Sequence, residues 1–154
     1  MGKLFEITNY IINKGKELAS LTFPNEEFVL DYVAIFCRDG EEISSLTQEI
    51  EQLGDEVEET STGKTYKLRN PLNTAVGNLY LIKLRHPDHT RPQRGEPDFR
   101  VSDYFHFKSR YSKTPGITLI ERDDYEMLEL SHPKYDVLVY FPNKPLGVEL
   151  GIGV

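Results

Sequence analysis

Apolar residues recur at two different spacings along the first third of this chain, and the spacing changes where one element is expected to give way to the next. Over residues 4–21 they recur at roughly helical spacing, which predicts an amphipathic helix that Pro24 ends. Residues 28–37, FVLDYVAIFC, are a run rich in β-branched and aromatic side chains and predict a buried strand. Residues 38–54 return to helical spacing, with Asp39 placed to cap the helix.

The rest of the chain predicts strands separated by tight turns and one short helix. Two strands are expected around the turn at residues 61–63, and a third follows. After a proline-rich loop a strand restarts, and a short helix precedes three more strands. The expected ranges are 55–69 and 78–87, then 98–104, the helix at 105–113, and strands at 117–130, 136–142 and 147–152. The order strand, helix, three strands therefore occurs twice.

Two stretches of similar pattern support this duplication. Residues 65–84, TYKLRNPLNTAVGNLYLIKL, and residues 136–150, DVLVYFPNKPLGVEL, each place a Pro/Asn/Gly turn between two apolar strands. We interpret them as the closing hairpins of two βαβββ units, because a second unit would bury a sheet face that one unit leaves exposed. The alternative is two unrelated hairpins in an α+β domain. The expected divisions are residues 1–27 (helix and linker), 28–85 (first unit), 86–97 (linker) and 98–154 (second unit), within one compact domain.

Composition and charge narrow the classes of partner. The net charge of −7 argues against nucleic-acid binding, and no apolar run approaches the roughly 20 residues that span a bilayer. The N-terminus lacks the features of a signal peptide, and the lone Cys37 is compatible with a reducing compartment, so we expect a cytoplasmic protein. The charge is uneven: residues 28–63 carry one Arg against ten acids, whereas residues 64–113 carry eleven Lys and Arg against four.

The tandem βαβββ pattern resembles the vicinal oxygen chelate superfamily, which includes glyoxalases, extradiol dioxygenases and bleomycin-resistance proteins. Where that superfamily typically reads DHVAL in its first strand and YFRDPDGNLIEL in its closing hairpin, this chain has DYVAIFC and YFPNKPLGVEL. The N-terminal helix, the first strand ending in Cys and the linker LRHPDHTRPQRGEPDF are similar to the YecM-like branch. The resemblance covers roughly residues 28–152 and implies an α+β fold with one curved, mostly antiparallel sheet.

Metal-using members of this superfamily ligate one divalent cation through inward residues of the first and last strand of each unit. Carried onto this chain, these positions fall on Tyr32 and Phe99, on Leu81 or Lys83, and on Glu149. Only Glu149 is a competent ligand in that set, so the resemblance implies a degenerate metal site and no cofactor. A register slip of one residue would instead bring in Asp31 and Asp98, an oxygen-rich pair suited to Mg²⁺ or Mn²⁺.

The basic middle of the chain offers further candidates. Arg85, Arg91 and Arg94 carry guanidinium groups that suit a carboxylate or phosphate. His86 and His89 have HxxH spacing, but the neighbouring prolines favour a loop, so these two residues with Glu149 are only a fallback metal site. Solvated surface is the competing interpretation of all five residues.

Three functions follow from these observations. The first is a glyoxalase-like protein whose cleft holds a small anionic molecule against Tyr32, Lys83, Phe99, Glu149 and the three arginines. Lys83 and Glu149 are its acid–base candidates, and whether it is an enzyme stays open. The second is a non-catalytic protein–protein interaction module that uses the acidic and basic halves. The third is a divalent-metal-dependent isomerase or lyase. A homodimer is compatible with each of the three.

Overall fold

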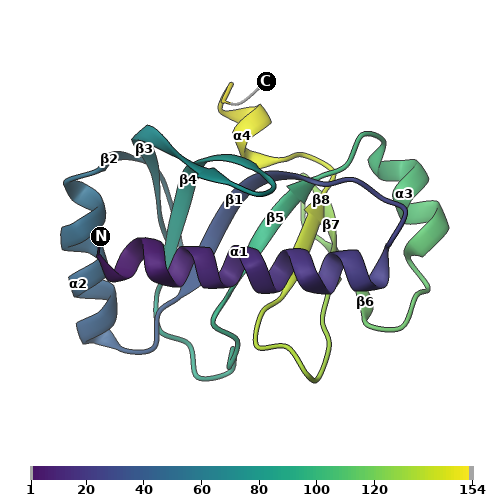
Figure 1. Ribbon diagram of the computed structural model, residues 1–154, viewed down its shortest axis with the longest axis horizontal. Coiled ribbons are helices and arrows are strands. Elements are labelled where there is room, and N and C mark those ends of the chain that lie inside the picture. The colour runs from purple at the N-terminus through teal and green to yellow at the C-terminus, as the bar shows by residue number, and fades with distance from the viewer. Residues whose placement is uncertain (1, 153–154) are drawn as a thin grey trace.

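The computed structural model describes residues 2–152. Through these residues runs an eight-stranded sheet in the order β2-β3-β4-β1-β5-β8-β7-β6 (Figure 1). The strands are β1 (Val29–Phe36), β2 (Gly54–Thr60), β3 (Gly63–Thr74), β4 (Gly77–Arg85), β5 (Gly95–Arg100), β6 (Ile117–Glu121), β7 (Glu126–Leu130) and β8 (Val139–Pro142). The helices are α1 (Lys3–Thr22), α2 (Gly40–Glu51), α3 (Tyr104–Tyr111) and α4 (Leu146–Glu149).

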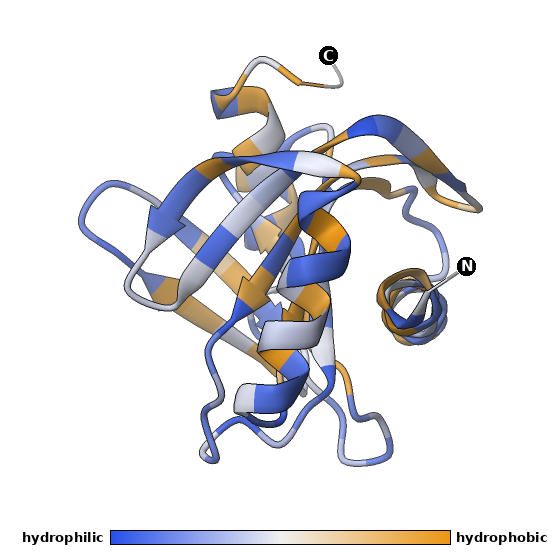
Figure 2. Ribbon diagram, turned by 90° about the vertical axis from the view of Figure 1, so that its left-hand side faces the viewer, coloured by the Kyte–Doolittle hydropathy of each residue, from blue (hydrophilic) through white to orange (hydrophobic). Residues whose placement is uncertain are grey.

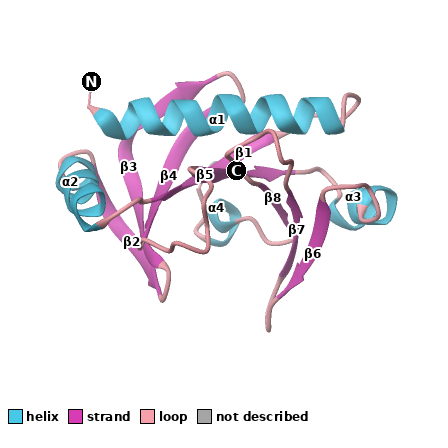
Figure 3. Ribbon diagram, turned by 90° about the horizontal axis from the view of Figure 1, so that it is seen from below, coloured by secondary structure: helices cyan, strands magenta, loops and turns pink. Residues whose placement is uncertain are grey.

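The sheet is built from two units with the same internal order. The first contains β1, α2 and β2 to β4, and the second contains β5, α3 and β6 to β8. In each unit the first strand lies parallel to the last, and β1 pairs antiparallel with β5 where the units meet. Seen from below, the sheet curves so that its two ends, β2 and β6, bend away from α1 (Figure 3). The predicted fold of two βαβββ units, one curved, mostly antiparallel sheet and an N-terminal helix is confirmed.

The two expected closing hairpins had different outcomes. Residues 65–84 do form the β3–β4 hairpin, which turns at Gly77 with a φ of 115° that favours glycine. Residues 147–152 were predicted to form a strand, and this was wrong, because α4 begins at Leu146. The preceding strand, β8, already lies between β5 and β7, so it has no free edge for another strand. The third strand of the second unit arises instead because residues 117–130 divide into β6 and β7.

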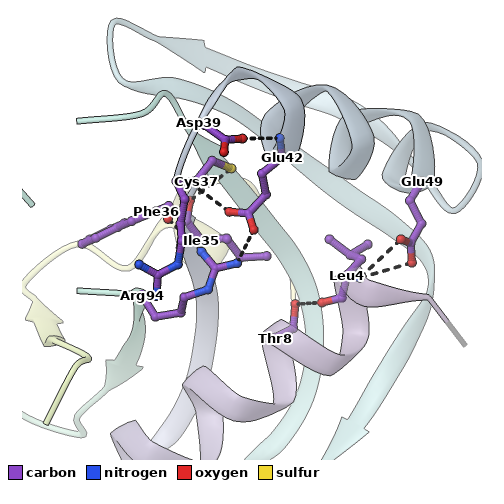
Figure 4. Close-up of polar contacts among 10 residues, drawn as sticks. Leu4, Thr8, Ile35, Phe36, Cys37, Asp39, Glu42, Glu49 and Arg94 are labelled. Carbon is purple, nitrogen blue, oxygen red and sulfur yellow. Dashed lines mark hydrogen bonds and ion pairs between the residues drawn. The ribbon is translucent and has the colours of Figure 1, made fainter. Parts of the chain in front are cut away.

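Helix α1 covers the convex face of the sheet, and Figure 2 shows it end-on to one side of the strands. Its buried residues follow helical spacing: Leu4, Thr8, Ile11, Ile12, Gly15, Leu18 and Ala19. Gly15 lies so close to Pro97 of β5 that a β-carbon there would clash with the proline ring. The N-terminus of α1 is held by α2, because the Leu4 N–H donates to both carboxylate oxygens of Glu49 at 3.3 Å (Figure 4).

The main core lies between the convex face and the helices. Five phenylalanine rings pack there with centroids 4.9–6.3 Å apart, and they come from the α1–β1 connection and from β5, α3 and β8. They are Phe23, Phe28, Phe99, Phe107 and Phe141. In the part of the chain that the structure describes, no helix is long and apolar enough to cross a membrane.

Candidate functional site

The concave side of the sheet holds a cavity of about 480 Å³. Its floor comes from the four central strands, and its walls come from β2, β7, α4 and the connecting loops. The strand residues of the floor are Tyr32 and Ala34 of β1, Lys83 and Arg85 of β4, Glu96 and Asp98 of β5, and Tyr140 and Pro142 of β8. Because alternate residues of a strand face opposite sides, the same four strands supply both this cavity and the core behind it.

Two acids on β5 are buried at the floor. Glu96 is 1% exposed and Asp98 is 4% exposed, and a hydrogen bond joins their side chains. Burial, followed by the charge of Asp98, raises the pKa of Glu96 well above its usual range. Burial also raises the pKa of Asp98 to about 7, while the hydrogen bond to Glu96 and the charge of Lys83 oppose that rise. Both shifts favour the protonated, neutral forms of these acids in the folded protein.

Cationic side chains line the rest of the cavity. They are Lys83, Arg85, Arg91, Arg122 and Lys144. Arg85 lies over the ring of Phe36 at 4.8 Å from its centroid, and Arg91 lies 3.6 Å from Glu129 with a third of its side chain exposed. Burial, and then the charge of Arg85, lowers the pKa of Lys83. The acids Glu58, Asp124 and Glu149 also line the cavity, so its charge is mixed.

The structure brings most of the sequence-predicted site residues to this cavity. Tyr32, Lys83, Glu149, Arg85 and Arg91 line it, although Glu149 comes from α4 and not from a closing strand. Whether they bind a ligand there remains a prediction.

Phe99 and Arg94 do not line the cavity. Phe99 is fully buried in the main core on the other face of β5, because its neighbour Asp98 has the cavity-facing register. Arg94 donates to the Phe36 carbonyl at 2.9 Å and to the Glu42 carboxylate at 2.8 Å, so it fastens the start of α2 to the sheet (Figure 4). Both residues therefore support the fold, whereas the sequence analysis predicted that they bind a ligand.

The structure separates the alternative acid pair. Only Asp98 enters the cavity, because β1 has an irregular register between Leu30 and Tyr32 at Asp31. Asp31 instead accepts from Arg100 Nε at 2.7 Å and from the Gly147 N–H at 3.2 Å. It thereby anchors α4 over one end of the cavity, whose lining includes Leu146 and Glu149.

The residues at the superfamily's metal positions do not suit a divalent cation. In this fold the polar residues that the first and last strands of the two units present to the cavity are Tyr32, Lys83, Arg85, Glu96, Asp98 and Tyr140. Two carboxyls, two phenols, an ammonium and a guanidinium make a poor donor set, because the two cations repel a metal ion. His86 and His89 are exposed in the linker, outside the cavity that Glu149 lines. Within residues 2–152 no group of three His, Cys, Asp or Glu side chains could hold a metal ion.

Sequence reasoning missed Glu96, Arg122 and Tyr140 as lining residues. Glu96 had been assigned to the linker, whereas β5 begins at Gly95. The spacing of Glu96 and Asp98 was the available signal, since acids two residues apart on a strand share one face. Arg122 lies in the turn that splits the expected strand at residues 117–130, where its N–H donates to the Tyr125 carbonyl at 2.8 Å.

Comparison with known proteins supports the fold and goes no further. No protein-family profile matches the chain, and no curated protein sequence matches it. A solved structure described as structural genomics protein EC4020 superposes with a TM-score of 0.68 and 17% identity, over 92% of this chain and 85% of that chain.

Solved structures that resemble the chain more weakly include members of the glyoxalase/bleomycin resistance protein/dioxygenase superfamily. One such member, from Vibrio splendidus 12B01, has a TM-score of 0.45 and 11% identity over 75% of this chain and 97% of that chain. Methylmalonyl-CoA epimerase from Mycobacterium tuberculosis has a TM-score of 0.42 and 19% identity over 74% and 86%. The match to EC4020 supports the fold of this chain, an open, curved eight-stranded sheet with an N-terminal helix.

Proposed function

We propose that this chain is a glyoxalase-like protein whose concave cavity binds a small anionic molecule without the help of a metal. The observation that carries the proposal is the balance of charge in the cavity. Five Lys and Arg side chains line it, and two of its five acids, Glu96 and Asp98, have pKa values raised by burial. At neutral pH the cations therefore outnumber the ionised acids, which favours an anionic ligand.

Three arginines are the best-placed contacts for that anion. Arg85, Arg91 and Arg122 line the cavity, and guanidinium groups bind carboxylates and phosphates through paired hydrogen bonds. Among the described residues, the one salt bridge that these arginines form joins Arg91 to Glu129 at 3.6 Å, a long contact that a ligand can replace. A cavity of about 480 Å³ is within the range of small-molecule sites.

Lys83 and Glu149 remain the candidates for acid–base chemistry, and we assign no reaction to them. Both line the cavity, and the lowered pKa of Lys83 makes it easier to deprotonate. Assignment to the YecM-like branch also remains a proposal, supported by the long helix α1 and the proline-rich linker between β4 and β5.

A thermal-shift screen with small carboxylates and phosphates tests the anion site. A ligand that binds only the folded state raises the melting temperature, and we expect one anion class to do so in the parent. Arg85→Ala should lose that stabilisation. Arg110→Ala is the matched control, because Arg110 is exposed on α3 outside the cavity and should leave the ligand effect unchanged. The proposal fails if no anion stabilises the parent, or if both variants respond as the parent does.

A further inference from the structure

The two buried acids at the floor of the cavity, Glu96 and Asp98, will be called the floor pair. Each has one carboxyl oxygen, Glu96 Oε2 and Asp98 Oδ1, that is buried and has no hydrogen-bond partner. Buried polar atoms in folded proteins nearly always have a partner, and buried acids are nearly always paired with a cation. No donor from another described residue reaches these two oxygens.

No protein cation neutralises the floor pair. Among the described residues, no ion pair within 4 Å involves either acid, and Lys83 Nζ donates at 2.9 Å to Thr60 Oγ1 on the cavity wall. Other ionisable groups act on the pair from neighbouring strands: Tyr32 and Asp31 on β1, Lys83 and Arg85 on β4, and Tyr140 on β8.

Asp31, another buried acid of this protein, has hydrogen-bond donors for its carboxylate. The Asp31 side chain is fully buried, yet Arg100 Nε lies 2.7 Å from it and the Gly147 N–H donates to both its oxygens at 3.2 Å. The fold thus supplies donors to the buried acid that holds α4 in place. Among the described residues it places no cation within 4 Å of the floor pair, which lines the cavity.

We propose that the floor pair receives the ammonium group of a ligand whose acidic group lies against the cavity arginines, so that the ligand is a small zwitterion. The proposal rests on the proposed function, because it needs the anion site. An ammonium offers three N–H donors to the pair of carboxyls and neutralises a buried charge, whereas a neutral hydroxyl offers one donor and no charge. Amino acids and amine-bearing phosphate esters have this chemistry.

Ligands that differ only in the amine test the inference. Isothermal titration calorimetry on the full chain at pH 8 would compare glutarate with glutamate, and ethyl phosphate with O-phosphoethanolamine. In one of these pairs the amine-bearing member should bind about tenfold tighter or more, as a charge-assisted hydrogen bond to a buried acid implies. Binding should also release protons, since the ammonium favours the ionised floor pair, and repeating the titration in buffers of different ionisation enthalpy measures that release.

The variants Glu96→Gln and Asp98→Asn should each abolish the preference for the amine while they keep the affinity for the amine-free partner. If the amine-free member binds as tightly as its partner in both pairs, the inference is overturned and the anion site stands. If no member of either pair binds, both proposals fail. The preference is measured on the parent protein, so it does not depend on the variants folding.

Discussion

Pro97 and Phe99 lie on one face of β5, against α1 and the phenylalanine cluster, whereas Glu96 and Asp98 lie on the other face, at the floor of the cavity. All four side chains are almost fully buried. The convex face buries apolar surface, which stabilises the fold, and the cavity face buries acids without cations, which costs stability. The two faces of β5 are equally buried, but burial on the convex face stabilises the fold, whereas burial on the cavity face destabilises it at the candidate site.

The largest expected effect comes from removing apolar volume on the convex face. Phe99→Ala should lower the free energy of unfolding by about 3–5 kcal/mol, because Phe99 is fully buried among Phe28 and Phe141. Urea denaturation measures the change. Glu96→Gln, on the cavity face of the same strand, is the control and should change stability by less than about 1 kcal/mol. Equal losses in the two variants would remove the difference between the faces.

Two arginines of the linker before β5 should behave differently. Arg94→Ala should cost about 2–3 kcal/mol, because it removes the cation paired with Glu42 and the side-chain donor to the Phe36 carbonyl. Arg91→Ala should cost less than about 1 kcal/mol, because its contact with Glu129 is long and partly exposed. Chemical denaturation measures the free energy of unfolding of both variants. A larger loss for Arg91→Ala than for Arg94→Ala would contradict the structural role given to Arg94.

The cavity face should make stability depend on pH. The pKa of Asp98 in the folded protein is about 7, above its value of 3.8 in an unfolded chain. Its contribution is therefore fully present below pH 3.8 and is lost as the pH rises through about 7. Asp98→Asn should be more stable than the parent at pH 8, by about 1–2 kcal/mol.

The matched change on β1 has the opposite sign. Asp31→Asn weakens the ion pair with Arg100 and should destabilise the protein at pH 8. Denaturant unfolding curves recorded from pH 5 to pH 8 give the free energy of unfolding of the parent and of both variants. A parent and an Asp98→Asn variant with parallel pH profiles would show that Asp98 does not titrate in this range.

The smallest expected effect comes from a substitution at Gly15, where α1 lies close to the convex face of the sheet. Gly15→Ala should lower stability by about 1 kcal/mol, since the clash with Pro97 exceeds the gain in helix propensity. Gly40→Ala is the matched helical control, because nothing lies within 4 Å of the added β-carbon, and it should be neutral or slightly stabilising. Thermal melts that show a stabilised Gly15→Ala variant would mean that α1 can move away from β5 at little cost.

Local pattern was enough to predict most elements and the duplication. Helices α1 and α2 and strand β1 lie within three residues of their expected ranges, since apolar spacing and the Asp39 cap are local signals. The predictions of secondary structure were wrong where strand pairing decides whether a segment becomes a strand. Residues 147–152 have the apolar pattern of a strand, but the neighbouring strand has no free edge to pair with them.

The sequence by itself determined the two βαβββ units, the N-terminal helix and the concentration of arginines in the middle of the chain. Only the tertiary structure decided that Asp98 and not Phe99 faces the cavity, that Arg94 packs against α2, and that Glu96 belongs to a strand. Element type depends on neighbours within a few residues, whereas the register of β5 depends on its pairing with β1 and β8. A shift of one residue in that pairing exchanges the core face for the cavity face, and only contacts distant in sequence fix it.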